Sequence, residues 1–350
     1  MIPNIKIGNF NLGSNFEPII VAEMSGNHNQ SLDKALKIVK EVAKTGAHAL
    51  KIQTYTADTL TIDIKDGDFF LGDKNSLWHG TSMYDLYTKA HTPWEWHEQI
   101  FDLCKELNLL CFSSPFDDTA VDFLEDLNCP CYKIGSTEST DLNLLKKVAR
   151  TCKPLIISTG MATVEELHEI VSTVRNEGCE ELVLLKCTAA YPALASDANL
   201  LTIPNMREMF DSHIGLSDHS LGTGVAVASA ALGAVMIEKH FTLSRKDKGV
   251  DSAFSMEPRE FKQLVDDTKV AWSALGDVHY GPTSNENSKL SRRSLYVVKD
   301  IKKGAIITKD NVRSIRPGYG LPSKYFEEVL GKRVKKDVLR GTRLSFALIQ

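Results

Sequence analysis

Short apolar runs alternate with amphipathic segments along the first 280 residues of the chain. The runs lack strict apolar–polar alternation, as expected for parallel strands that are covered on both faces. They lie at Ile19–Ala22, Ala49–Ile52, Leu109–Phe112, Cys131–Ile134, Leu155–Ile157, Leu182–Leu185, His213–Leu216 and Val235–Ile237. Helical periodicity appears between most of them, at Ser31–Thr45, Trp94–Leu107, Asp118–Leu127, Asp141–Thr151 and Thr163–Asn176, and again at Glu257–Leu275. Strands and helices in this order and number predict a (β/α)8 TIM barrel over residues 1–280.

Every apolar run is followed by polar side chains that are capable of chemistry. In this fold the C-terminal strand ends surround one mouth, so these side chains are expected to converge there. They are Glu23, Lys51 with Gln53, Ser113 with Ser114, Lys133 with Ser136 and Glu138, Ser158 with Thr159, Lys186 with Thr188, Ser217 with Asp218 and His219, and Glu238 with His240. Contact with solvent does not explain so regular a placement, and the sequence therefore predicts an enzyme.

Two of these polar strand ends carry a histidine. The small-residue segment Leu221–Leu232 lies between the last two apolar runs, so the region reads as a strand–helix–strand unit with His219 and His240 on adjacent strands. Two imidazoles that converge in this way can hold a divalent metal and leave other positions open for substrate. The alternative is that each histidine ends a strand and bonds only to backbone.

Three lysines are expected to face the same mouth, namely Lys51, Lys133 and Lys186. Ammonium groups among hydroxyls suit a phosphate or carboxylate ligand, and the serines available are Ser114, Ser136, Ser158 and Ser217. Two alternatives stay open at this point. The lysines can pair with Glu23, Glu138 or Glu238, or one lysine can form a Schiff base as in barrel aldolases.

Three segments lie outside the repeating pattern. Ile5–Leu12 alternates around Gly8-Asn9, which predicts a hairpin that closes the barrel floor. Tyr55–Pro93 is a long connection rich in glycine and aromatic residues, which we interpret as a lid rather than a passive surface loop. Residues 281–294 read as a linker to a small β-rich module at 295–350 that docks on its own or a partner's barrel. Its expected strands are Leu295–Val298, Ala305–Ile307, Val334–Val338 and Leu344–Ala347.

Composition narrows the class of protein. Of the 350 residues 43% are hydrophobic and 25% charged, as in ordinary globular proteins. The net charge of −4 argues against a nucleic-acid binder, and the lack of a long apolar run or a leader pattern argues against a membrane protein and for a cytoplasmic one. The seven cysteines show no C-x-x-C spacing, so we expect buried free thiols, including Cys187 as a packing residue.

The ordered motifs resemble those of the sialic acid synthase family. They are Glu23 with Asn27-His28-Asn29, Lys51-Ile-Gln-Thr, Ser113-Ser-Pro-Phe, Lys133-Ile-Gly-Ser, Ser158-Thr-Gly-Met, Cys187-Thr with Tyr191-Pro, Gly215-Leu-Ser-Asp-His and Glu238-Lys-His-Phe-Thr. The tail, with Ile301-Lys-Lys-Gly and Arg316-Pro-Gly-Tyr-Gly, resembles the antifreeze-like (SAF) domain of that family. The resemblance implies condensation of phosphoenolpyruvate with an N-acetylated amino sugar, release of phosphate, and dependence on Mn²⁺ or a similar ion such as Mg²⁺ or Co²⁺. It also implies a homodimer in which the SAF domain reaches the partner's active site.

The resemblance assigns roles by position. His219 and His240 fall at the metal ligands, and Arg316 would reach the sugar's acyl group from the neighbouring subunit. The phosphoenolpyruvate positions are Lys51, Ser114, Lys133, Ser136, Ser158 and Ser217, and the positions near metal and sugar are Glu23, Glu138, Tyr191, Glu238 and Asp251. Ala189 departs from the sialic acid enzymes, which have asparagine there.

Further motifs are similar to the pseudaminic acid synthase branch, whose substrate is a 6-deoxy-2,4-diacetamido sugar. They are Glu23-Met-Ser-Gly-Asn-His-Asn, the aromatic segment from Leu77-Trp to Trp94-Glu-Trp, and Lys186-Cys-Thr-Ala-Ala-Tyr-Pro. The layout suggests attack of phosphoenolpyruvate carbon 3 on a polarised sugar aldehyde and loss of phosphate by C–O cleavage, with Glu23 and Asp251 passing protons. N-acetylneuraminate or legionaminate synthesis, a Schiff-base aldolase, and a non-catalytic carbohydrate- or ice-binding protein are the alternatives.

Overall fold

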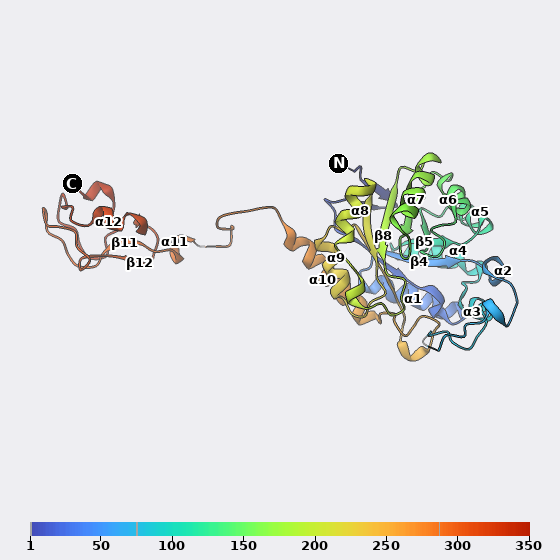
Figure 1. The fold of residues 1–350 in the computed structure, drawn as a ribbon. Helices are drawn as coiled ribbons and strands as arrows, with labels where there is room; N and C mark the ends of the chain where they lie inside the picture. Colours follow the sequence, from blue (N-terminus) through green and yellow to red (C-terminus); the bar gives the residue numbers. More distant parts are fainter. Residues whose placement is uncertain (1, 75, 287) are drawn as a thin grey trace. The chain divides into compact units, whose positions relative to one another are not determined.

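The computed structural model describes residues 2–74, 76–286 and 288–350. The chain forms two compact units, Met1–Gly276 and Asp277–Gln350 (Figure 1).

The first unit is built on a closed barrel of eight parallel strands, which confirms the predicted fold. The strands follow one another around the barrel in the order β10-β3-β4-β5-β6-β7-β8-β9. Every expected apolar run forms a strand, and most strands extend further at the C-terminal end than the runs did. They are β3 (Ile19–Glu23), β4 (Ala49–Thr54), β5 (Leu110–Pro115), β6 (Tyr132–Ile134), β7 (Leu155–Ser158), β8 (Leu182–Cys187), β9 (His213–Ser217) and β10 (Met236–His240).

Helices follow the strands and surround the barrel (Figure 1). They are α1 (Leu32–Thr45), α4 (His97–Glu106), α5 (Asp118–Asp126), α6 (Leu142–Ala149), α7 (Val164–Asn176), α8 (Thr202–Phe210), α9 (Gly224–Ala231) and α10 (Pro258–Leu275). Local signals explain their starts: the Ser31 hydroxyl accepts from the Lys34 amide, and Thr163 and Glu166 form a capping box. The helix α9 starts later than expected because Gly222, with φ of +78°, turns the chain first. In the described parts of the chain, no helix is both long and apolar enough to cross a membrane.

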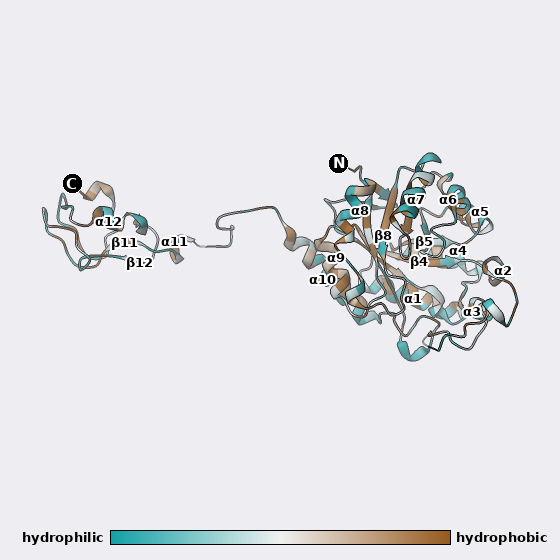
Figure 2. Cartoon of the chain, in the orientation of Figure 1, coloured by the Kyte–Doolittle hydropathy of each residue, from teal (hydrophilic) through white to brown (hydrophobic). Residues whose placement is uncertain are grey.

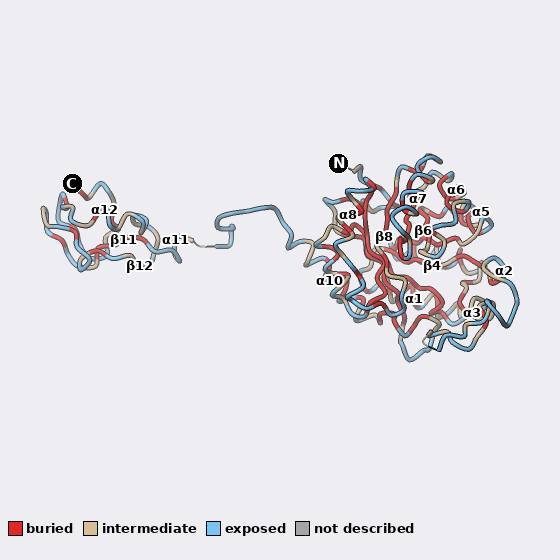
Figure 3. Tube along the Cα trace, viewed as in Figure 1, coloured by how far each residue is buried: buried red, intermediate tan, exposed pale blue. Residues whose placement is uncertain are grey.

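The core of this unit lies between the barrel and its helices. The strands are drawn mainly brown for hydrophobic residues in Figure 2 and red for buried ones in Figure 3. Buried helix residues such as Ile38, Leu145 and Val171 belong to the same apolar cluster as the strand residues. The barrel is therefore a packed scaffold on which the strand ends are held in fixed positions.

The N-terminal hairpin closes one end of the barrel, as expected. Its strands β1 (Ile5–Ile7) and β2 (Phe10–Leu12) pair antiparallel, and Ile5, Ile7 and Leu12 are buried in the main core. The Pro3 carbonyl lies 2.8 Å from Nε2 of His213, the first residue of β9. The hairpin thus covers the N-terminal strand ends, opposite the predicted mouth.

The long connection after β4 is folded rather than irregular. It contains α2 (Ala57–Leu60), the 3-10 turn η2 (Gly67–Phe69), α3 (Met83–Ala90) and η3 (Trp94–Trp96), while Asn75 lies outside the described residues. The Gln30 amide nitrogen donates to the carbonyls of Lys89 and His91, at 3.1 and 2.6 Å. The connection is therefore fastened to the start of α1.

The second unit has its own small core but differs from the expected strands. Its sheet has the order β12-β11-β13, formed by β11 (Ser294–Val297), β12 (Val312–Ile315) and β13 (Leu321–Pro322). The predictions of strands at 305–307, 334–338 and 344–347 are wrong. The first two segments make only isolated bridges, and the third follows a bridge at Arg343 and runs into a 3-10 turn. The apolar residues of these segments, Ile307, Val334, Val338 and Leu344, are nevertheless buried. The apolar sequence pattern therefore predicted burial correctly but did not predict strand pairing.

The expected linker at 281–294 is also partly ordered. It contains the short helix α11 (Ser288–Ser291), and β11 begins at its last residue. Asn287, within this stretch, lies outside the described residues. The remaining helical elements of the unit are η6 (Ser323–Tyr325), α12 (Phe326–Val329) and η7 (Phe346–Leu348).

Candidate active site

A cavity of about 420 Å³ lies at the C-terminal ends of the barrel strands. Its polar lining comes from strands far apart in the sequence, with Lys51 from β4, Lys133 from β6, and Glu238 and His240 from β10. Most of the predicted site residues line it: Lys51, Ser114, Lys133, Ser136, Glu138, Ser158, Tyr191, Ser217, His219, Glu238, His240 and Asp251. The sequence-based expectation that these side chains share one mouth agrees with this arrangement.

Register explains why the charged groups meet. In the barrel ladder Glu23 is paired with His240 on one side and with Lys51 on the other, while Glu238 is paired with Ser217. Side chains in register on parallel strands point to the same face of the sheet, and Glu238 and His240, two residues apart on β10, share that face as well. The polar ends of four neighbouring strands therefore all point into the barrel.

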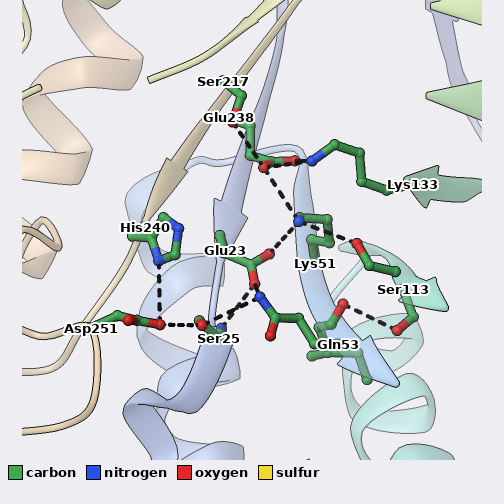
Figure 4. Close-up of polar contacts among 12 residues, drawn as sticks. Glu23, Ser25, Lys51, Gln53, Ser113, Lys133, Ser217, Glu238, His240 and Asp251 are labelled. Atoms are coloured by element: carbon green, nitrogen blue, oxygen red, sulfur yellow. Dashed lines mark hydrogen bonds and ion pairs between the residues drawn. The ribbon is translucent and has the colours of Figure 1, made fainter. Parts of the chain in front are cut away.

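Two lysines and two glutamates form a buried chain of charges at the cavity floor (Figure 4). Lys51 Nζ lies 3.0 Å from Glu23 Oε2 and 3.3 Å from Glu238 Oε1. Lys133 Nζ donates to both oxygens of Glu238, at 3.0 and 3.3 Å. Ser217 Oγ also donates to Glu238, at 3.3 Å. The alternative in which lysines pair with Glu23 and Glu238 is therefore what the structure contains, whereas Glu138 pairs with neither lysine at salt-bridge distance among the described residues.

Burial and the neighbouring charges set the pKa values of these two lysines and two glutamates. Burial raises the pKa of Glu238, but Lys133 and Lys51 outweigh it and lower the value to about 2. Burial dominates at Glu23, whose pKa is raised despite Lys51. Burial also lowers the pKa of Lys133, while at Lys51 the two glutamates overcome burial and raise the pKa. Glu238 is therefore a carboxylate at neutral pH, placed between two ammonium groups.

The two histidines lie beside each other above this chain. The ring centroids of His219 and His240 are 5.3 Å apart. His219 Nδ1 lies 2.9 Å from the Thr188 carbonyl, which fixes the proton on Nδ1 and leaves the Nε2 lone pair free of that bond. His240 Nδ1 is buried without a hydrogen-bond partner and lies 4.0 Å from Asp251 Oδ2. Burial, followed by His219, lowers the pKa of His240, so its imidazole is neutral.

Aromatic rings enclose the pair of histidines. The Tyr191 ring is 4.3 Å from that of His219, and the Phe254 ring is 4.9 Å from that of His240. Burial acts to lower the pKa of His219, but the neighbouring Cys187 side chain outweighs it, so the pKa is raised. Within residues 2–74, 76–286 and 288–350, no three His, Cys, Asp or Glu side chains are grouped to hold a metal ion. Any ion at this place would thus rely on the two imidazoles and on non-protein ligands.

Besides His240 Nδ1, two buried polar atoms of the described lining residues lack a hydrogen-bond partner. One is Oγ of Ser158, and the other is Oε2 of Glu138, whose Oε1 accepts from Thr137 Oγ1 at 2.6 Å. An unpartnered buried polar atom is costly, so both point to a ligand that binds there. Burial raises the pKa of Glu138.

Two expectations about β8 are wrong for the same reason. Lys186, expected in the mouth, is not part of the lining and donates to the Cys187 carbonyl at 2.8 Å. Cys187, for which packing was favoured over a place in the pocket, lines the cavity together with His219. Successive side chains of a strand point to opposite faces, so the cysteine faces inward where the lysine does not.

Arg316 belongs to the second unit, and its proposed contact with a partner's site stays a prediction. It follows β12 directly.

Two residues beside the predicted set complete the polar contacts of the cavity. Ser25 hydrogen-bonds the Asp251 carboxylate, and the Gln53 side-chain amide donates to Glu23 Oε1 at 2.9 Å (Figure 4). Gln53 was expected at the mouth together with Lys51, and strand parity places both on the same face, whereas sequence reasoning missed Ser25. Ser25 gave no such signal, because the contact joins segments 226 positions apart.

The long connection after β4 supplies the apolar wall of the cavity. Tyr55, Leu60, Leu71, Trp78, Leu86 and Tyr87 all line it. Trp78 Nε1 donates to the Val250 carbonyl at 3.0 Å, and its ring lies 5.8 Å from that of Tyr191. The segment therefore covers the mouth and reaches the loop after β10.

Comparisons with known proteins identify the family of this chain. The NeuB family model matches residues 38–280, and the SAF domain model matches residues 292–350. The chain belongs to the NeuB family. A pseudaminic acid synthase of Campylobacter jejuni is 44% identical to this NeuB-family chain, and the match covers 97% of this chain and 98% of the relative. An N,N'-diacetyllegionaminic acid synthase of the same species is 34% identical over 91% and 96% of the two chains.

A solved structure supports the same assignment. The N-acetylneuraminic acid synthetase of Leptospira borgpetersenii, in complex with citrate, matches this NeuB-family chain with a TM-score of 0.72 and 29% identity. The match covers 81% of this chain and 94% of that one.

Proposed function

We propose that this chain is a pseudaminic acid synthase. It would condense phosphoenolpyruvate with 2,4-diacetamido-2,4,6-trideoxy-L-altrose to give pseudaminate and phosphate. The observation that carries the proposal is 44% identity to a pseudaminic acid synthase over nearly both whole chains, against 34% to a legionaminic acid synthase. The cavity chemistry is consistent with both halves of this reaction.

The enol phosphate would bind at the lysine chain. Lys51 and Lys133 supply two buried ammonium groups, and Ser114, Ser136, Ser158 and Ser217 supply hydroxyls along the same wall. The Ser158 hydroxyl is buried without a partner, which leaves it free to bond an anionic oxygen. Glu238 shares both lysines, so a bound anion would take over part of its contacts.

The sugar would bind under the apolar wall of the long connection. A 6-deoxy sugar with two acetamido groups presents methyl groups, and Leu60, Leu71, Trp78 and Tyr87 offer matching surface. The Glu138 carboxyl has one buried oxygen free for a sugar hydroxyl or amide. A hydrophobic wall discriminates weakly against one added hydroxyl, so shape contributes much of the selection.

The two imidazoles fit a divalent ion. His219 presents Nε2 because Nδ1 is engaged by the Thr188 carbonyl, and His240 has a buried ring nitrogen without a hydrogen-bond partner. Such an ion, Mn²⁺, Mg²⁺ or Co²⁺, would supply Lewis acidity toward the aldehyde oxygen of the sugar.

The side chains would act on the reacting atoms as follows. Carbon 3 of phosphoenolpyruvate bonds to the aldehyde carbon, water adds at carbon 2, and the bond from carbon 2 to the bridging oxygen breaks. That oxygen leaves with the phosphate, and a keto acid remains. Lys51 and Lys133 hold the phosphate and carboxylate groups, while Glu23 and Asp251, whose pKa values burial raises, orient water and move its proton.

The second unit would complete the site from a neighbouring subunit. We propose a homodimer in which Arg316 of the SAF domain reaches the acyl group of the sugar bound by the partner's barrel. Arg316→Ala should raise KM for the sugar and leave the affinity for phosphoenolpyruvate unchanged, and sedimentation should give a dimer mass.

A phosphate-release assay across a panel of amino sugars tests the function. The panel holds 2,4-diacetamido-2,4,6-trideoxy-L-altrose, its legionaminate-type stereoisomer and N-acetylmannosamine. We expect turnover with the first to exceed the others at least tenfold in kcat/KM. A preference for either of the other sugars would replace the proposal with legionaminate or N-acetylneuraminate synthesis.

Two further measurements separate the mechanism from its rivals. With ¹⁸O in the bridging position of phosphoenolpyruvate, the label should appear in phosphate, and its appearance in the keto product would contradict C–O cleavage. Borohydride should trap no adduct on Lys133, whereas an aldolase would give one. Mn²⁺ binding to the resting enzyme, followed by electron paramagnetic resonance, should disappear in His219→Ala and His240→Ala.

A further inference from the structure

A buried ion pair lies directly behind the two cavity histidines. Asp218 precedes His219, and Lys239 precedes His240, on neighbouring strand ends. Asp218 Oδ2 and Lys239 Nζ are 2.7 Å apart, with side chains 4% and 1% exposed. Neither side chain lines the cavity, since neighbouring residues of an extended chain alternate between faces. We name this pair the Asp218–Lys239 clip.

The clip joins the two strand ends beyond the point where the sheet ladder stops. The register between β9 and β10 ends with Ser217 opposite Glu238, one step before the clip. The Asp218 amide makes a last bond to the Glu238 carbonyl at 2.9 Å. In the described part of the chain, the backbones of His219 and His240 share no ladder pair.

Each histidine is anchored on its far side instead. The His219 carbonyl accepts a hydrogen bond from the Ala193 amide at 3.1 Å, which links His219 to the loop after β8. His240 pairs with Glu23 of β3, and its carbonyl accepts the Met256 amide at 2.8 Å. These anchors hold the two residues to different parts of the barrel, so they do not by themselves fix the distance between the rings.

The clip links the two strand ends directly, and its charged atoms make further hydrogen bonds. Lys239 Nζ also donates to the Ser220 carbonyl at 2.7 Å, and Asp218 Oδ1 accepts the Ser220 amide at 2.8 Å. The chain segment on both sides of His219 is thereby bound to the strand that carries His240.

We propose that the Asp218–Lys239 clip positions the two imidazoles at the spacing that a divalent ion requires. This positioning role rests on the function proposed above and concerns the metal site of that function. A buried ion pair contributes little net stability, because desolvation offsets attraction, so its main effect here is geometric. Asp218 and Lys239 are positioning residues and do not touch substrate.

The test is Mn²⁺ binding to the double variant Asp218→Asn/Lys239→Met. Both substitutions keep the side-chain size, and Asn keeps an acceptor for the Ser220 amide. By analogy with outer-shell changes at metal sites, we expect a loss of Mn²⁺ affinity of about tenfold or more. Removing both charges together leaves no unpaired buried charge, so the thermal midpoint should stay near that of the wild type.

A second variant decides the question if the double variant does not fold. Asp218→Glu keeps both charges and moves the carboxylate by one methylene, so its Mn²⁺ affinity should fall between those of wild type and double variant. The matched control is Arg150→Met/Glu177→Gln, which removes an ion pair of 2.8 Å between the C-terminal ends of α6 and α7. The control should leave Mn²⁺ affinity unchanged.

The outcomes separate this inference from the proposed function. Folded clip variants that bind Mn²⁺ within twofold of the wild type overturn the positioning role, even if phosphate release by the wild type supports the function. A wild-type protein that releases phosphate but binds no Mn²⁺ overturns the metal site and the clip's role together, and leaves the reaction standing.

Discussion

Replacing Glu238 with glutamine should destabilise the barrel, and an anionic ligand should restore much of the loss. Lys133, whose side chain is 3% exposed, donates to both oxygens of Glu238 and to no other carboxylate in the described ranges at salt-bridge distance. Removing one partner of a buried pair costs about 3–5 kcal/mol because the other charge stays buried. In the variant Lys51 still pairs with Glu23, and the glutamine side chain still offers one oxygen acceptor. We therefore expect a loss of folding free energy at the lower end of this range, about 3 kcal/mol.

Differential scanning calorimetry gives the measurement. For a unit of this size a loss of about 3 kcal/mol lowers the thermal midpoint by roughly 6–12 °C. Phosphoenolpyruvate at about 100 times its Kd stabilises by about 2.7 kcal/mol. In Glu238→Gln the ligand would meet a lysine without a counter-ion, so its affinity and the midpoint shift it produces should exceed those of the wild type.

The matched control is Glu138→Gln. Glu138 lines the same cavity, but one of its oxygens is buried without a partner, and among the described residues no lysine lies within salt-bridge distance of it. Its neutral replacement should leave the midpoint unchanged or raise it slightly. The reasoning fails if Glu238→Gln unfolds within 2 °C of the wild type, or if phosphoenolpyruvate shifts both proteins equally.

Three other predictions concern parts of the barrel unit away from the lysines. Burial lowers the pKa of His28 and of His97 to about 4, below the unfolded value of about 6.5, so the unfolded chain takes up protons at higher pH than the folded one. The stability that these histidines contribute should be full above pH 6.5 and fall toward pH 4, by about 2 kcal/mol per histidine between pH 7 and pH 5. Urea unfolding midpoints measured at pH 7 and pH 5 should show this loss, and the loss should be smaller in His97→Gln. Trp78→Phe removes the hydrogen bond to the loop after β10, worth about 1 kcal/mol, and should raise KM for the sugar severalfold while kcat changes little; equal KM values would contradict the closed cover. Gly215→Ala would place a methyl group against the Met236 carbonyl and should lower stability by about 2–3 kcal/mol, measured by thermal unfolding against Gly72→Ala, where an added methyl meets nothing.

The barrel and the composition of its mouth were predictable because both rest on local patterns. A parallel strand covered on both faces reads as a continuous apolar run, and the residue type after each run is visible in the sequence. Lys51, Lys133 and Glu238 were placed together on that basis alone, and in the structure each lysine ammonium lies within 3.3 Å of Glu238 Oε1.

The rest depended on information that a linear pattern lacks. Strand parity decides between Lys186 and Cys187, and the end of an apolar run does not show where a strand ends. The bond between Ser25 and Asp251 joins distant segments, so only the closed barrel brings them into contact. In the second unit, Val334 and Val338 are buried but make only isolated bridges, which sequence periodicity cannot distinguish from strands.

The N-terminal hairpin occupies the end of the barrel opposite the site. Ile5, Ile7 and Leu12 are buried there, and the Pro3 carbonyl lies 2.8 Å from His213 at the start of β9. Exchange of reactants and products therefore falls to the side of the C-terminal strand ends, where Trp78 of the long connection is hydrogen-bonded to Val250.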